Sequence, residues 1–250
     1  MPAPIPKLLL HCLLLPTLLQ VAANVPALII FGTRRSTQGT HNDIPTLLKS
    51  NFDPYGRDFS GGKPTGRFCN GKLATDFLSE AFGLPPTVPA YLDPAYGIRD
   101  FAVGVSFASA GTGLDNATSD VLAVIPLWEE VAYFKEYIRR LRKYMGQARA
   151  QRTLREALYI NYYTPGIHSR SSELTVEQFE DFLVDIAARF ITEIYRLGAR
   201  KISFSGFENI EQACCSTGCS SWLPVRRAGS PHMSGRDKYA FWDAPTPPRS

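Results

Sequence analysis

Short apolar segments separated by longer amphipathic stretches set the pattern of this chain. Residues 26–32 (PALIIFG) are apolar up to the final glycine, which is typical of a strand covered on both faces. Residues 101–107 (FAVGVSF) predict a second strand, and a turn of small residues follows at 108–113. Residues 157–160 and 201–205 are two further strand candidates.

Helical segments with recognisable ends lie between these strands. Capping residues, a proline in the first turn and a closing glycine mark their limits. Strands that alternate with helices indicate βαβ units, and hence a parallel α/β sheet. The three predicted helices run from a cap at Asn70 to Phe82, from Pro126 to Met145 before Gly146, and from the capping box of Thr175 and Gln178 to Gly198.

A basic run spans residues 138–155. A helix that binds a polyanion is one interpretation, and a solvated helix face is the other. We favour the solvated face, because the cations are scattered around the helix instead of forming one stripe. The basic residues are Arg139, Arg140, Arg142, Lys143, Arg149, Arg152 and Arg155.

Composition narrows the class of protein. The 250 residues are 44% apolar and 20% charged, which excludes wholesale disorder, collagen and coiled coil. Their number favours one domain over two. The net charge of +4 gives no support for nucleic-acid binding, and we expect no nucleic-acid partner.

The first 23 residues have the pattern of a secretory signal peptide. Lys7 precedes the leucine-rich stretch 8–19, and small residues at 21–23 offer a cleavage site. A membrane anchor is the alternative, but the stretch is shorter than the ~20 apolar residues a spanning helix needs. We therefore expect a secreted chain without stable membrane insertion after cleavage, whose single domain covers residues 24–250.

In a secreted chain, the cysteines can form disulfides and one tripeptide can be N-glycosylated. Asn116, in Asn-Ala-Thr, is a glycosylation acceptor in a secreted chain, although the tripeptide also occurs by chance. An even number of cysteines remains after cleavage and permits disulfides whose pairing the sequence does not assign. No second ligand pair has zinc-like spacing, so we expect no metal site. The cysteines are Cys69, Cys214, Cys215 and Cys219.

Several blocks of the chain resemble one known family, the plant-type GDSL esterase/lipases of the SGNH hydrolase superfamily. The resemblance implies a flavodoxin-like three-layer α/β/α sandwich with a parallel sheet, which cleaves esters with a Ser-His-Asp triad and no cofactor. In this family a Gly and an Asn complete the oxyanion hole. The blocks are 26–32, 54–59 (PYGRDF), 65–71 (TGRFCNG), 89–94 (PAYLDP), 107–113 (FASAGTG), 195–201 (YRLGARK), 213–215 (ACC) and 241–244 (FWDA).

The nucleophile position departs from the family pattern. After Gly32 the family has Asp-Ser, whereas this chain has Thr33-Arg34. Arg34 therefore occupies the nucleophile position, and a guanidinium stays protonated and has no lone pair with which to attack a carbonyl. Ser36 could substitute only if a displacement of two residues were tolerated, and errors of ~1 Å already cost heavily.

Two further parts of the family's machinery are missing. The resemblance puts the triad Asp at Asp243, but Thr246 stands where the His belongs. The Gly-Thr-Asn-Asp turn that supplies the oxyanion Asn is absent between residues 160 and 161, so Asn161 is not that residue. A second family segment is missing near 206–213. Gly113, and after it Gly111, are the candidates for the oxyanion-hole glycine, although a tight turn explains both equally well.

These departures predict a protein of the family that lacks catalytic activity. The alternatives are an active ester hydrolase that uses a non-standard nucleophile, and a non-catalytic ligand-binding protein. Any ligand would be a small-molecule or lipid ester, and we expect a monomer. The internal deletions leave an incomplete sandwich, which predicts uncovered apolar faces and low solubility.

Overall fold

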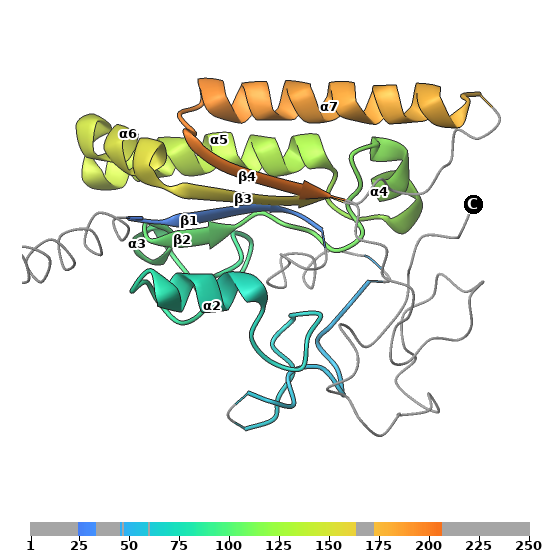
Figure 1. The fold of residues 1–250 in the computed structure, drawn as a ribbon. Coiled ribbons are helices and arrows are strands. Elements are labelled where there is room, and N and C mark those ends of the chain that lie inside the picture. The colour runs from blue at the N-terminus through green and yellow to red at the C-terminus, as the bar shows by residue number, and fades with distance from the viewer. Residues whose placement is uncertain (1–24, 34–45, 47, 60, 164–172, 207–250) are drawn as a thin grey trace, which may run out of the picture.

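A four-stranded parallel sheet forms the centre of the molecule (Figure 1). The computed structural model describes residues 25–33, 46, 48–59, 61–163 and 173–206. The sheet has the order β2-β1-β3-β4 and confirms the predicted parallel α/β fold. Its strands are β1 (Leu28–Gly32), β2 (Gly104–Ser106), β3 (Leu158–Tyr163) and β4 (Lys201–Gly206).

Strand β1 lies inside the sheet and is buried along its whole length. It pairs with β2 on one side, and on the other with β3 from Leu28 opposite Leu158 to Gly32 opposite Tyr162. Its alternating side chains enter two different apolar clusters, Ile29 and Phe31 in one and Leu28 and Ile30 in the other. Because both faces are covered, the strand needs the continuous apolar run seen in the sequence.

Helices cover both faces of the sheet (Figure 1). Helices α5 (Leu127–Met145), α6 (Gln147–Glu156) and α7 (Val176–Arg196) lie on one face, and α2 (Ala74–Ala81) lies on the other. Two short helices, α3 (Ile98–Phe101) and α4 (Asn116–Leu122), flank β2 in the sequence. The described residues therefore form the three layers that the family resemblance implies.

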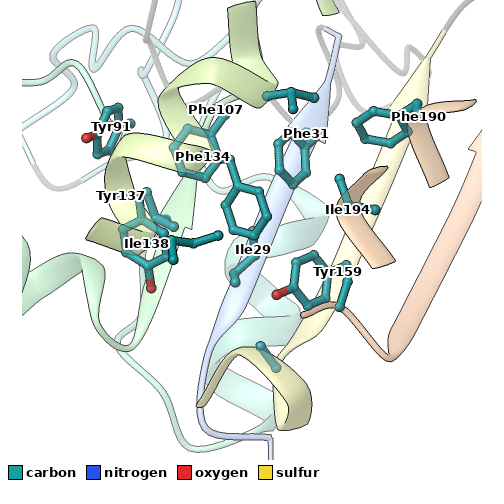
Figure 2. Close-up of a cluster of buried hydrophobic side chains, with 14 of the residues drawn as sticks. Ile29, Phe31, Tyr91, Phe107, Phe134, Tyr137, Ile138, Tyr159, Phe190 and Ile194 are labelled. Atoms are coloured by element: carbon teal, nitrogen blue, oxygen red, sulfur yellow. The ribbon is translucent and has the colours of Figure 1, made fainter. Parts of the chain in front are cut away.

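The larger core cluster is built from aromatic rings (Figure 2). The ring of Phe31 on β1 lies 5.2 Å from that of Phe107, 5.4 Å from that of Phe134 on α5 and 5.5 Å from that of Phe190 on α7. One side chain of the central strand thus joins the loop after β2 to both long helices. Offset and edge-on ring pairs of this kind add about 0.5–1.5 kcal/mol each beyond their buried area.

The predicted ends of the two long helices are confirmed. Helix α5 follows Pro126 and ends before Gly146, whose φ of 84° breaks the helix. At the start of α7, the Thr175 hydroxyl accepts a hydrogen bond from the Gln178 amide (3.3 Å), and the Gln178 side chain accepts one from the Thr175 amide (2.9 Å). This reciprocal pair is the capping box read from the sequence.

Predicted boundaries are wrong at two element starts that an aspartate decides. The strand expected over 101–107 is only β2, because Phe101 closes helix α3, which is capped by a hydrogen bond from the Gly97 amide to the Asp100 carboxylate (2.9 Å). Helix α2 begins at Ala74 and not after a cap at Asn70, since the Asp76 carboxylate accepts from the Leu73 amide (2.9 Å) and starts the helix there. In both cases an aspartate inside the first turn fixes the helix start.

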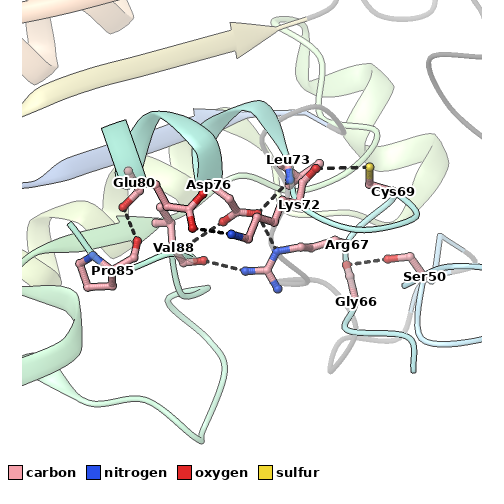
Figure 3. Close-up of polar contacts among 11 residues, drawn as sticks. Ser50, Gly66, Arg67, Cys69, Lys72, Leu73, Asp76, Glu80, Pro85 and Val88 are labelled. Carbon is pink, nitrogen blue, oxygen red and sulfur yellow. Dashed lines mark hydrogen bonds and ion pairs between the residues drawn. The ribbon is translucent and has the colours of Figure 1, made fainter. Parts of the chain in front are cut away.

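A buried ion pair joins the loop before α2 to the helix itself (Figure 3). The guanidinium of Arg67 lies 3.1 Å from the Asp76 carboxylate and also donates to the carbonyl oxygen of Val88 (3.2 Å). Asp76 is fully buried and accepts a further bond from the Val88 amide (2.9 Å). One carboxylate therefore holds the 65–71 loop, the start of α2 and the segment before β2 together.

The basic run of residues 138–155 is divided between the end of α5 and helix α6, with Gly146 between them. All seven of its Lys and Arg side chains are exposed. Leu141, Ala150 and Leu154 of the same helices are buried in the core. The exposed cations thus form the solvent side of two amphipathic helices, as favoured from the sequence.

Candidate functional site

The carboxyl ends of β1 and β3 mark the expected position of a site. Ligands of open parallel sheets bind beyond the carboxyl ends of the strands, where neighbouring connections leave in opposite directions along the sheet. In the order β2-β1-β3-β4 this point lies between β1 and β3, because the chain goes from β1 to β2 on one side and returns to β3 on the other. The residues that follow Gly32 therefore lie at the switch point.

The turn after β1 requires glycine at residue 32. Gly32 has a φ of 112°, and a Cβ atom built on it would lie 1.9 Å from the carbonyl oxygen of Tyr162 on β3. The next amide, that of Thr33, donates to the same carbonyl oxygen at 2.8 Å. The absence of a side chain thus lets β1 and β3 stay paired up to the point where the chain turns away.

The Thr33 hydroxyl connects this turn to the loop after β2. Thr33 is buried, and its Oγ1 accepts a hydrogen bond from the Gly111 amide at 3.0 Å. Gly111 has a φ of 87°, and a Cβ atom there would lie 2.5 Å from the Cδ1 of Leu48. Gly111 is thus needed for a tight turn, and its N–H group is engaged inside the chain.

Gly113, the other glycine candidate, lies two residues further along the same loop and is buried. The loop leads into α4, whose first residue, Asn116, is exposed. The Asp115 carboxylate caps this helix by accepting from the Ala117 amide (3.2 Å). Both the oxyanion-hole role of Gly113 and the glycosylation of Asn116 stay predictions.

Asn161 lies within strand β3 and not in a turn beyond it. It is fully buried, and its amide nitrogen donates to the Ser203 carbonyl oxygen on β4 at 2.9 Å. Ile160 and Asn161 are consecutive residues of the strand, which continues without interruption to Tyr163. The strand expected at 157–160 is therefore longer than predicted.

A buried carboxylate, which our sequence analysis did not single out, lies at this edge of the sheet. Glu130, in the first turn of α5, is fully buried. Its Oε2 accepts from the Gly32 amide and from the Tyr163 hydroxyl, each at 2.9 Å, and its Oε1 accepts from the Ser109 amide at 3.3 Å. Burial raises the pKa of Glu130 well above its ordinary 4.5, and these hydrogen bonds lower it only in part.

A signal for this residue was present in the sequence. Glu130 lies three residues after Leu127 and four before Phe134, so the helical period places it on the apolar face of α5. A charged residue at a position that the helical period assigns to the core is unusual, because a buried carboxylate is costly unless it is hydrogen-bonded. Such a position marks a candidate for a specific polar contact.

The chain is similar to three GDSL esterase/lipases of Arabidopsis thaliana. It is 56% identical to one over 206 residues, which is 78% of this chain and 58% of that relative. It is 54% identical to a second over 80% of the chain and 51% identical to a third over 83%, covering 59% of each. The chain belongs to the GDSL esterase/lipase family. No family model matches it.

The chain thus spans slightly less than three fifths of the length of these GDSL esterase/lipases. Two of the family blocks lie within the described ranges next to the sheet. One ends with Gly32, the last residue of β1, and is followed by Thr33, and the other forms the small-residue turn after β2. The same parallel sheet brings these two loops together through the bond between Thr33 and Gly111.

The other predicted positions of the family's catalytic groups lie outside the described residues. They are Arg34 and Ser36 after β1, and Asp243 and Thr246 near the end of the sequence. Cys214, Cys215 and Cys219 also lie outside, while Cys69 forms no disulfide with any described residue.

The described ranges hold neither a cluster of metal ligands nor a membrane-spanning helix. They contain no group of three or more His, Cys, Asp or Glu side chains that could hold a metal ion. None of the helices in the same part of the chain has the length and apolar character needed to cross a membrane.

Proposed function

We propose that this chain is a secreted protein of the GDSL esterase/lipase family that does not hydrolyse esters. The observation that carries the proposal is Arg34, which directly follows Gly32 and Thr33 at the end of β1. The family resemblance requires the nucleophilic serine at this position. Because a guanidinium is protonated at every accessible pH and has no lone pair to donate, it cannot attack an ester carbonyl.

The missing base and donor support the same conclusion. Thr246 stands where the family has its histidine, so Asp243 has no imidazole to orient. Ile160 and Asn161 are neighbours within β3, which leaves no room for the family's asparagine turn between them. Triad members act as a unit, so the loss of the serine or of the histidine alone removes nearly all turnover.

The oxyanion donors are depleted as well. The Gly111 amide donates to the Thr33 hydroxyl, so its N–H group is not directed at a substrate. Gly113 is left as the better candidate for a donor. The loss of one such donor costs about 100- to 1000-fold in rate, and the missing asparagine would already have removed one.

An ester assay on the purified, folded chain tests the proposal. A soluble p-nitrophenyl ester serves as the substrate, and the Asp243→Ala variant serves as the control. We expect no saturable turnover above that of the control, and no covalent adduct of a fluorophosphonate probe on any serine. Saturable turnover well above the control, or a labelled serine, would overturn the proposal.

Two variants show why the chain is inactive or active in the ester assay. Changing Thr33→Asp together with Arg34→Ser restores the nucleophile but neither the base nor the asparagine turn, so we expect no gain in activity. A large gain would mean that the chain holds a base and a donor elsewhere. If the unmodified chain is active and Ser36→Ala abolishes the activity, the alternative of a displaced nucleophile is correct.

The remaining parts of the proposal concern location and ligand. We propose that the chain is secreted and glycosylated at Asn116, which is accessible at the start of α4. A mass loss on treatment with peptide-N-glycosidase, absent in Asn116→Gln, is the expected result. Any ligand would be a small-molecule or lipid ester that is bound without turnover by the folded, monomeric fraction of the chain.

A further inference from the structure

The carboxylate of Glu130 contacts the ends of two strands, β1 and β3, and the loop that follows β2. It accepts from the Gly32 amide, the last of β1, and from the hydroxyl of Tyr163, the last residue of β3. Its third contact, the Ser109 amide, lies three residues after β2. Each contacted residue therefore stands where a loop leaves the sheet.

The surroundings of this carboxylate are apolar. Glu130 is fully buried, its helix contributes Leu127, Val131 and Phe134 to the larger core cluster, and no Lys or Arg of the described chain pairs with the group. Transferring a carboxyl group into such surroundings is unfavourable, and an apolar side chain of similar volume would be at least as stabilising. A packing role alone therefore does not account for an acid at this position.

Hydrogen-bond geometry accounts for it. Gly32 faces the β2 side of β1, since its carbonyl oxygen accepts from the Ser109 amide after β2, and its own amide donates to Glu130, whereas the next amide, that of Thr33, donates to Tyr162 on β3. The Ser109 amide is shared between the Gly32 carbonyl oxygen at 2.8 Å and Glu130. A buried amide without a hydrogen-bond partner destabilises the fold by about 1–3 kcal/mol. The carboxylate supplies that partner for the Gly32 amide at the end of β1.

We propose that Glu130 is a positioning residue that fixes the ends of β1 and β3 and the loop after β2 relative to one another. Its two oxygens hold the starting points of the three loops at fixed distances, and helix α5 supplies the rigid support. The inference goes beyond the proposed loss of activity and does not depend on it, because it concerns the backbone at the edge of the sheet and not the reacting side chains.

Amide hydrogen exchange on the whole chain tests this role. Glu130→Leu keeps most of the volume and removes every acceptor. We expect about tenfold faster exchange, or more, in peptides that contain Gly32, Ser109 and Tyr163, with the protection of α6 unchanged. Glu130→Gln keeps one carbonyl oxygen for Gly32 and Tyr163, so it should recover most of the protection at Gly32.

Two controls separate positioning from general stability. Tyr163→Phe removes one of the three contacts and should speed exchange near residue 163 more than near Ser109. Thr153→Ala, on α6, alters a buried side chain that donates to the Met145 sulfur, and it should leave all three loop starts unchanged. The proposed positioning role is wrong if Glu130→Leu speeds exchange uniformly along the chain, or if it leaves the Gly32 and Ser109 amides protected. If the Leu variant does not fold, the proposal is overturned when Glu130→Gln and Tyr163→Phe show equal exchange at Gly32, Ser109 and Tyr163.

Discussion

Glu130 shows at the residue scale how burial and hydrogen bonding compete. Burial raises the pKa of its carboxyl group well above 4.5, while the polar groups of Gly32, Tyr163, Ser109 and Thr112 favour the charged form and offset part of that shift. Tyr163, the titratable side chain in contact with it, has its own pKa raised well above 10 by burial and by the carboxylate.

The raised pKa predicts the direction of a pH effect on stability. The folded state holds the Glu130 proton more tightly than the unfolded chain does. The stabilisation from this group is thus complete below pH 4.5 and is lost as the pH rises through the raised folded value. The difference in unfolding free energy between wild type and Glu130→Gln, from denaturant titrations at several pH values, should fall by up to about 1.4 kcal/mol per pH unit within that window.

Only this difference isolates the group, because other carboxylates change the stability of both proteins alike. A difference that stays constant from pH 4 to pH 8 would contradict the shift. A difference that grows with pH would mean that the hydrogen bonds outweigh burial and that the folded pKa is lowered.

At the scale of one element, α2 depends on the buried pair of Arg67 and Asp76. The Asp76→Ala change removes the partner of a guanidinium whose side chain is 10% exposed, and it also leaves the Leu73 and Val88 amides without their acceptor. Breaking a buried pair on one side costs about 3–5 kcal/mol. We expect a loss of that size in the free energy of unfolding, measured by denaturant titration.

The same helix offers a matched control. Glu80 pairs with Lys72 across the exposed side of α2, where both side chains are at least 30% exposed. Surface pairs contribute about 0–1 kcal/mol, so Glu80→Ala should cost little. If Asp76→Ala and Glu80→Ala lower the free energy of unfolding by similar amounts, the buried pair does not stabilise the protein more than the exposed pair does.

Element ends were predictable where the signal is local. The capping box of Thr175 and Gln178 and the glycine after α5 act within one turn, and both predictions are confirmed. The start of α2 and the extent of β2 were predicted wrongly. The Asp76 and Asp100 carboxylates accept hydrogen bonds at the starts of α2 and α3, and these contacts fix the two boundaries. Glu130 was missed because its three partners are 21, 33 and 98 residues away.

At the scale of the whole molecule, one part of the sheet is less covered than the rest. Leu158 and Ile160 on β3 are only partly buried, and Lys201 and Ser203 opposite them on β4 are exposed. In the described part of the chain β4 is also an edge strand. Open apolar positions next to a free strand edge favour association.

We therefore expect low solubility or partial order of the isolated chain. Ile160→Thr keeps the β-branched shape and should reduce association, measured by light scattering, whereas Val184→Thr on the exposed face of α7 should leave it unchanged. A monodisperse monomer with a sharp cooperative thermal transition would contradict the expectation.

The sequence by itself determined the parallel α/β class, the long helices and the family, and it predicts that Arg34 stands at the nucleophile position. Each of these follows from local periodicity or from the identity of a residue at a matched position. Only the tertiary structure decided that the Thr33 hydroxyl accepts from the Gly111 amide and that Glu130 joins the ends of β1 and β3 to the loop after β2. Such contacts depend on how distant segments pack, and no local pattern carries that information.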